Sequence, residues 1–109
     1  MGIEFGKRSL ITNAAMTSSF MSDPIDLVQR IGFSIHNVFT GSPNGSFYIA
    51  VSIDNIQWIL LPDSSQAISA AGDVFYNVSD SKYVAARLHY AFTSGSGTLN
   101  STYSTKEAI

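Results

Sequence analysis

The feature that most constrains the fold of this chain is a two-residue alternation of apolar and polar side chains. Residues 29–39, 46–53 and 82–93 carry apolar side chains at alternate positions, for example Ile31, Phe33, Ile35 and Phe39 in the first segment. Successive side chains of a β-strand point to opposite faces of a sheet, so this period predicts half-buried strands. No stretch repeats apolar residues at helical spacing over three turns. The sequence therefore predicts an all-β protein.

Clusters of turn-forming residues divide the alternating segments into about eight short strands. The Thr-Gly-Ser-Pro-Asn-Gly cluster at residues 40–45 predicts a hairpin, and Ser-Gly-Ser-Gly at residues 94–97 predicts a second tight connection. Residues 56–61 contain few polar side chains. This composition predicts a strand that is buried on both faces or lies at a subunit contact. Short strands joined in this way predict an antiparallel β-sandwich of jelly-roll-like form.

The 109 residues are enough for one domain, and they divide at Pro24. Residues 1–24 lack a clean period and predict an extended N-terminal arm, whereas residues 25–109 form the predicted sandwich domain. We expect the arm to lie across a neighbouring subunit and to order on assembly. Its apolar side chains are the candidate subunit contacts: Ile3, Phe5, Leu10, Ile11, Phe20 and Met21.

The composition excludes several classes of function. Six basic residues against eight acidic ones cannot form a broad surface for nucleic acid. No apolar run is long enough for a transmembrane helix, and the absence of Cys excludes thiolate zinc sites and thiol catalysis. Only 13% of residues are charged, while 17 Ser and 7 Thr supply much of the polarity. Such a surface is suited to contacts with neighbouring subunits, which predicts a homo-oligomer.

No arrangement of residues predicts catalysis, a metal or a cofactor. The two histidines, His36 and His89, fall at outward positions of predicted strands, and no nucleophile elbow accompanies them. The acidic residues Asp54, Asp63 and Asp73 lie in turns, where aspartate caps and bends the backbone. We therefore predict that the chain is not an enzyme and takes no small-molecule substrate. A small hydrolase that uses His36 and His89 is the weakest alternative.

Several segments between Phe39 and Ser101 resemble small β-sandwich structural proteins of bacteriophage virions. They include Thr-Gly-Ser-Pro-Asn-Gly-Ser-Phe at residues 40–47, Val-Ser-Ile-Asp-Asn-Ile-Gln-Trp at 51–58 and Thr-Ser-Gly-Ser-Gly-Thr-Leu-Asn at 93–100. The resemblance implies a virion component, such as a capsid decoration (cement) subunit that binds and stabilises the major capsid lattice. It equally allows a tail or vertex component. Its partners would be the major capsid protein or tail proteins, after assembly in the cytoplasm of the bacterial host.

A carbohydrate-binding module is the alternative from a different class. The segment at residues 51–58 also resembles one in discoidin-like, galactose-binding sandwich domains, although Asn55 stands where those domains often have Gly. Aromatic side chains such as Tyr48, Trp58 and Tyr83 could supply a platform on which a sugar ring stacks. Aromatic residues at strand spacing more often pack in the core or on a sheet face, so packing is the main prediction for these rings and sugar binding is the alternative.

Overall fold

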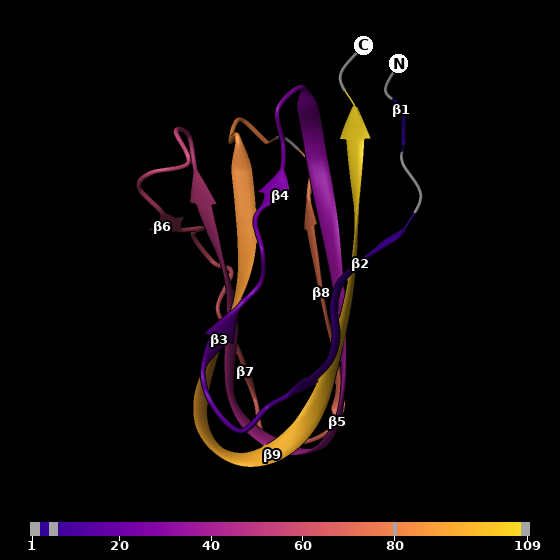
Figure 1. The fold of residues 1–109 in the computed structure, drawn as a ribbon, viewed down its shortest axis with the longest axis vertical. Helices are drawn as coiled ribbons and strands as arrows, with labels where there is room; N and C mark the ends of the chain where they lie inside the picture. The colour runs from indigo at the N-terminus through magenta and orange to yellow at the C-terminus, as the bar shows by residue number, and fades with distance from the viewer. Residues whose placement is uncertain (1–2, 5–6, 80, 108–109) are drawn as a thin grey trace.

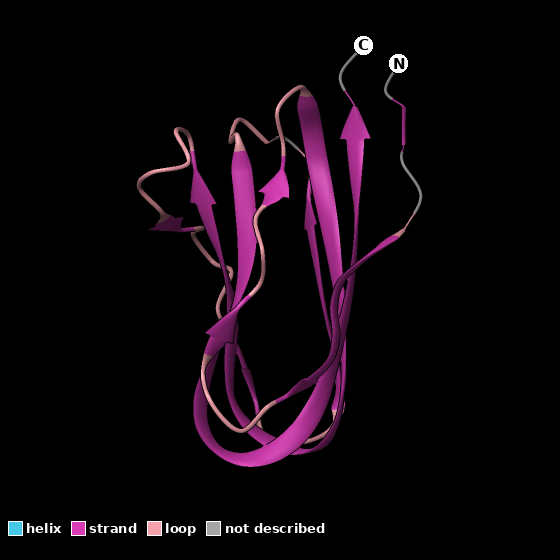
Figure 2. Cartoon of the chain, in the orientation of Figure 1, coloured by secondary structure: helices cyan, strands magenta, loops and turns pink. Residues whose placement is uncertain are grey.

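The computed structural model describes residues 3–4, 7–79 and 81–107 and shows a protein built from strands (Figures 1 and 2). This part of the chain contains no helix, and so none that could cross a membrane. It contains nine strands, two of which, β5 and β9, are 23 residues long. The strands are β1 (Ile3–Glu4), β2 (Arg8–Ala15), β3 (Phe20–Met21), β4 (Ile25–Asp26), β5 (Arg30–Ser52), β6 (Ile59–Leu60), β7 (Gln66–Ile68), β8 (Gly72–Val78) and β9 (Ala85–Glu107).

The two long strands form the frame of the molecule. β5 and β9 pair antiparallel along their length, from Arg30 opposite Glu107 to Ser52 opposite Ala85. Figure 1 shows the pair curving together at the lower end of the molecule, so that each strand runs through both arms of a U. A single two-stranded ribbon is thus folded over on itself.

The arms of the U are the two layers of a sandwich. One layer pairs residues 45–52 of β5 with residues 85–92 of β9, flanked by β6 and β7 on one side and by β3 and β4 on the other. The second layer pairs the other halves of β5 and β9, flanked by β8 on one side and by β1 and β2 on the other. We call the second one the β8 layer. The prediction of an all-β antiparallel sandwich is confirmed.

The predicted hairpin at residues 40–45 is wrong, and so is the tight connection at residues 94–97. Both segments lie inside the long strands and face each other at the bend, with Gly41 opposite Gly97 and Pro43 opposite Gly95. Glycine and proline permit a reversal of the chain and a joint bend of two paired strands equally well. Only the long-range pairing distinguishes the two outcomes, and it is not visible in a local pattern.

Glycine is required at the bend because the two backbones approach closely. Gly41 and Gly95 have φ angles of +84° and +83°, a region that side chains other than glycine rarely adopt. A Cβ atom at Gly41 would lie 2.7 Å from the carbonyl oxygen of Ser96, and one at Gly95 would overlap the carbonyl oxygen of Ser42. The bend therefore depends on these missing side chains.

Pro43 is compatible with a strand because of its place in the bend. Proline has no N–H group, so it is normally excluded from strands that have partners on both sides. β8 pairs with β5 only over residues 33–39, and β7 only over residues 45–47. At Pro43, β9 is thus the only described strand paired with β5, and no second partner needs the missing donor.

The aromatic core connects the two halves of β5. The rings of Phe39 and Phe47, on opposite sides of the bend, have centroids 5.5 Å apart, and Phe47 lies 5.2 Å from Tyr90 of β9. Phe47 and Tyr90 are almost completely buried, as are Ile35 and Ile49. Each such side chain contributes roughly 1.5–3 kcal/mol when it is removed from water. The alternation predicted for these strands therefore specifies the inner face correctly.

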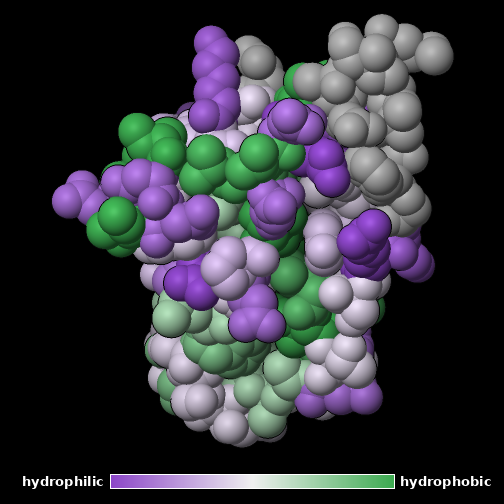
Figure 3. Space-filling model, turned by 45° about the horizontal axis from the view of Figure 1, so that its top comes forward, coloured by the Kyte–Doolittle hydropathy of each residue, from purple (hydrophilic) through white to green (hydrophobic). Residues whose placement is uncertain are grey.

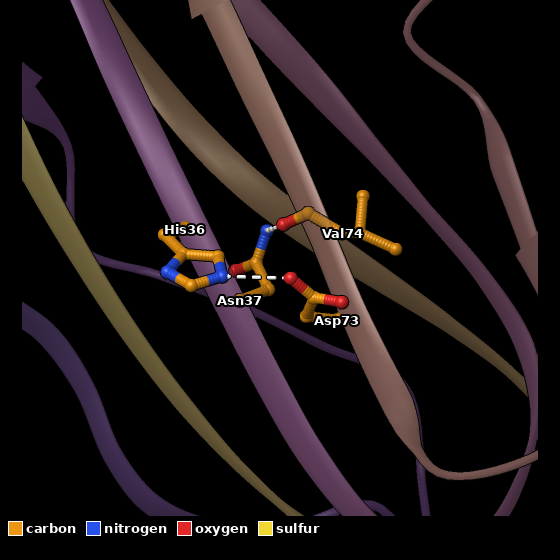
Figure 4. A network of polar contacts seen from close by, with 4 residues as sticks. All are labelled: His36, Asn37, Asp73 and Val74. Atoms are coloured by element: carbon orange, nitrogen blue, oxygen red, sulfur yellow. Dashed lines mark hydrogen bonds and ion pairs between the residues drawn. The ribbon is translucent and has the colours of Figure 1, made fainter.

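Two polar side chains that lie opposite each other, Asn37 and Ser101, are completely buried in the β8 layer. Asn37 lies on β5 between β8 and β9, and its amide nitrogen donates to the carbonyl oxygen of Val74 at 3.2 Å (Figure 4). Its amide oxygen accepts a hydrogen bond from the hydroxyl of Ser101, which lies directly opposite on β9. A buried polar group is costly unless its partners are in register, so this network disfavours a slipped pairing of the three strands.

The described strands of the segment predicted as an arm pair with β9 of the same chain. β2 and β3, which precede Pro24, pair with β9 of the same chain, as does β4, which follows it. The side chains of Leu10, Ile11 and Phe20 pack against the core, and the Phe20 ring lies 5.5 Å from that of Tyr90. β2 has register shifts on both sides of Ile11. These shifts interrupt the two-residue period, which is why the sequence around Leu10 and Ile11 shows no clean alternation.

We predict that Gly95→Ala destabilises the protein by ~1–3 kcal/mol, because alanine is strained at a positive φ and has no room there. Gly72→Ala is the matched control, since its Cβ would lie 4.0 Å from the nearest heavy atoms, in the ring of Phe39. Urea unfolding of the two variants and the unchanged protein measures the difference. Equal stabilities for the two variants would contradict the role given to the bend.

Candidate functional site

The connection after β5 is held by its own hydrogen bonds. The carboxylate of Asp54 accepts the backbone N–H groups of Ile56 at 2.9 Å and Gln57 at 3.0 Å. The hydroxyl oxygen of Ser52 accepts the N–H of Asn55 at 2.8 Å. The backbone hydrogen bonds from Gln57 and Ile56 lower the pKa of Asp54, because they stabilise its charged form. The loop therefore has a defined shape.

This loop presents large apolar side chains to solvent. Four of them are more than half exposed: Ile53 (72%), Ile56 (78%), Ile59 (61%) and Leu60 (53%). We call these four residues the apolar loop. Figure 3, which turns the upper end of Figure 1 toward the reader, shows hydrophobic residues at the upper left, over the β5–β6 connection, beside hydrophilic ones. Scattered single apolar residues are normal on a surface, whereas a group of this kind makes the connection the candidate site of this protein.

The strand predicted at residues 56–61 is largely absent. Only Ile59 and Leu60 are in a strand, and both are exposed. Burial on both faces is therefore wrong, because Asp54 and Ser52 bind the backbone of residues 54–57 in a turn instead. The other alternative, a subunit contact, stays a prediction. The signal that could have identified the apolar loop was the lack of polar residues between Ile56 and Leu61.

A hollow of about 180 Å³ lies beside the apolar loop. Ile53, Ile59 and Tyr83 line it together with the end of β5, and the polar side chains of Asp54 and Gln57 stand at the same hollow. An apolar side chain of a partner could enter here and contact both isoleucines. The hollow thus adds a concave surface with apolar lining beside the exposed isoleucines.

Aromatic and cationic side chains pack together on the outer face of the layer that contains β6. The guanidinium carbon of Arg87 lies 4.8 Å from the ring centroid of Trp58, and its Nε donates to the carbonyl oxygen of Ser22 at 3.2 Å. Two register positions further along, Tyr48 stacks on His89 with ring centroids 4.8 Å apart and planes at 15°. These contacts connect β5 and β9 with Ser22, which follows β3, and with Trp58 of the β5–β6 connection.

The aromatic residues of the predicted sugar platform each pack against another side chain or the core. Arg87 lies over the Trp58 ring, and His89 lies over the Tyr48 ring. Tyr83 packs against the core and lines the separate hollow beside Ile59. The structure thus gives each of these rings a packing role, and sugar binding stays an untested prediction.

The two histidines lie in different layers. His36 is in the β8 layer, where its Nε2 lies 2.9 Å from a carboxylate oxygen of Asp73 (Figure 4). His89 is in the opposite layer, stacked on Tyr48. The structure therefore does not bring together the two residues on which the hydrolase alternative depended. Within residues 7–79 and 81–106, no three His, Asp or Glu side chains are placed to hold a metal ion.

The predicted subunit contacts have different positions. Leu10, Ile11 and Phe20 are partly buried against the core of their own chain, whereas Met21 is 55% exposed beside His89. Ile3 is in β1, which pairs with β9, and Phe5 lies outside the described residues. A contact role for these residues stays a prediction, and the exposed Met21 is best placed for it.

Sequence comparison does not place the chain in a family, whereas its fold is shared with known structures. No family model matches it, and no curated protein matches its sequence. The SPBc2 prophage-derived protein YomS has a TM-score of 0.64 at 9% identity, over 98% of this chain and 96% of its own. The coat protein of Tobacco streak virus has a TM-score of 0.56 at 7% identity, over 98% of this chain and 86% of its own.

The PBSX exported protein XepA shows the same fold within a longer chain. It has a TM-score of 0.63 at 17% identity over 95% of this chain, which spans 37% of the XepA chain. At such identities the likeness shows a common fold alone. The jelly-roll-like sandwich is thus shared with prophage-derived proteins and a viral coat protein.

We predict that Arg87→Ala destabilises the protein by ~1–3 kcal/mol, through loss of the contact with Trp58 and the hydrogen bond to Ser22. Trp58 is the only tryptophan, so its emission should also shift to the red. Lys82→Ala, which removes an exposed cation, is the control. Unchanged emission in the Arg87 variant would show that the cation does not cover the ring.

We predict that the protein loses stability as the pH falls below about 6.5. Burial, followed by the charge of Arg87, lowers the pKa of His89 from its ordinary value of 6.5. The unfolded chain then binds a proton that the folded chain does not, so acid favours unfolding. Urea unfolding between about pH 7 and pH 5 should therefore show a smaller pH dependence for His89→Gln than for the unchanged protein. Equal slopes would contradict this role of His89.

Proposed function

We propose that this chain is a structural subunit of a virion, and that it serves as a capsid decoration subunit bound to the major capsid lattice. The exposed apolar loop is the observation that carries the proposal. Its four aliphatic side chains are more than half exposed and are presented by a loop that Asp54 and Ser52 hold in shape. A preformed apolar surface binds a protein partner with little loss of conformational entropy.

The charge of the loop supports a protein partner. Asp54 is the only charged residue between Ile53 and Leu60, and its carboxylate is engaged by the backbone of the loop. Burying the loop therefore does not leave an unpaired charge in the interface. Asn55 and Gln57, both exposed, can supply the polar rim that surrounds the apolar centre of most protein interfaces.

The position of the loop supports decoration over a tail or vertex role. It lies at the end of the sandwich opposite the bend, where Figure 1 shows the β5–β6 connection projecting from the sheets. A subunit with its apolar contact at one end is suited to docking on a lattice that has already formed. The fold shared with the viral coat protein and the prophage-derived proteins supports the wider assignment to a virion.

The test is binding to capsids assembled without this chain. We expect the unchanged protein to sediment with such capsids, and the double variant Ile53→Ser and Ile56→Ser to bind at least about tenfold more weakly, since each side chain contributes roughly 1.5–3 kcal/mol on full burial. Val28→Ser is the matched control, because Val28 is 53% exposed outside the loop. Equal binding by the double variant and the control would exclude the loop as the contact.

A further inference from the structure

β8 has an open edge. It pairs with β5 at seven consecutive positions, from Phe33 opposite Val78 to Phe39 opposite Gly72, without a register shift. No other described strand pairs with it. In such an edge strand, alternate residues point their N–H and C=O groups away from the neighbouring strand, in the plane of the sheet. There these groups can pair with another strand.

The opposite edge of the β8 layer is distorted. β2 has register shifts on both sides of Ile11, and Asn13 has a φ angle of 49°. Bulges of this kind twist an edge strand away from regular pairing and protect it from association. β8 carries no such irregularity over its paired residues. Of these two edges, only that of β8 is regular enough to add a strand.

The side chains beside this edge are apolar at its centre. Phe75, the middle residue of β8, is 62% exposed, and its ring lies 5.9 Å from that of His36 on β5. Val38, also on the outer face of β5, is 46% exposed. A strand added to β8 would cover part of Phe75, and the burial would add to the backbone hydrogen bonds.

The polar residues of β8 are complementary to a second copy of β8. In an antiparallel pair centred on Phe75, Asp73 of each copy lies opposite Asn77 of the other. One carboxylate oxygen of Asp73 contacts His36 at 2.9 Å, which leaves the other to accept a hydrogen bond. The amide oxygen of Asn77 accepts from Ser34 at 2.8 Å, so its amide nitrogen points elsewhere and can donate to that oxygen. In such a pair the two copies are related by a twofold axis at Phe75, so this contact forms twice.

Charge also favours this arrangement. Asp73 is the only charged residue of β8, and its contact with His36 offsets its charge whenever the histidine is protonated. The two copies of Asp73 would lie on opposite sides of the axis, each beside an asparagine rather than beside the other. A regular, self-complementary edge of this kind produces a closed dimer instead of a filament.

We propose that two copies of this chain associate through β8, antiparallel about a twofold axis at Phe75, and so join their β8 layers into one continuous sheet. The apolar loop lies in the other layer and takes no part. The inference therefore does not depend on the function proposed above, and either one can fail without the other.

Sedimentation equilibrium of the purified chain tests the dimer. We expect the mass to approach twice the 11.8 kDa of one chain as the concentration rises. Phe75→Lys should be monomeric, because two lysines would face each other at the axis, whereas the matched control Ile56→Lys should dimerise like the unchanged protein. A monomeric unchanged protein would overturn the proposal, and so would a dimer that survives Phe75→Lys.

A cross-linking experiment keeps the proposal testable if Phe75→Lys fails to fold. The chain has no cysteine, so a single introduced thiol reports on its own position. Directly opposed residues of antiparallel strands are close enough to approach disulfide geometry. Under mild oxidation we expect Phe75→Cys to form covalent dimers that Ile56→Cys does not form. Equal yields from the two variants would show that the contact is random collision.

Discussion

Close contact between the backbones of β5 and β9 at their shared bend is the constraint on which the remaining structure depends. At Gly41 and Gly95 no side chain fits between the strands, so the paired ribbon can fold over with one register shift at the bend, between Asn44 and Gly45. The fold brings Phe39 onto Phe47, two residues of the same strand, and the core forms around them. The sandwich is therefore closed by a bent ribbon rather than by a set of separate hairpins.

The bend also decides which surfaces remain for partners. Both long strands run through both layers, and the shorter strands pair with their outer sides. The shorter strands are therefore the edge strands of the two layers. The β5–β6 connection leaves the end opposite the bend and carries the apolar loop, whereas β8 borders the other layer and leaves its edge open. One frame thus leaves two separate surfaces exposed, the apolar loop and the edge of β8, for which we propose a lattice and a second copy as partners.

The sequence predicts structural features that neighbouring residues determine, such as the direction of side chains in a strand. It does not predict features that depend on distant residues, such as which strands pair. The alternation around Ile35 and Ile49 correctly assigns the inner face, because side-chain direction in a strand is a local property. The sequence does not reveal the bend, because residues 40–45 have the composition of a turn and their real partners, from Phe92 to Thr98, lie 47 to 58 residues away. Leu10 shows the same limit. Its apolar side chain is expected to be buried, but the sequence does not show whether its own chain or a neighbouring subunit buries it, and it packs against the core of its own chain.

Native-state hydrogen exchange is the most direct test of the claim that β5 and β9 fold as one bent unit. Amides of a single cooperative unit open together and share one opening free energy. We expect the buried parts of β5 on the two sides of Pro43, residues 33–39 and 47–51, to exchange with the same opening free energy. A distinctly lower value on one side would show that the layers open independently, and it would contradict a frame made of one continuous ribbon.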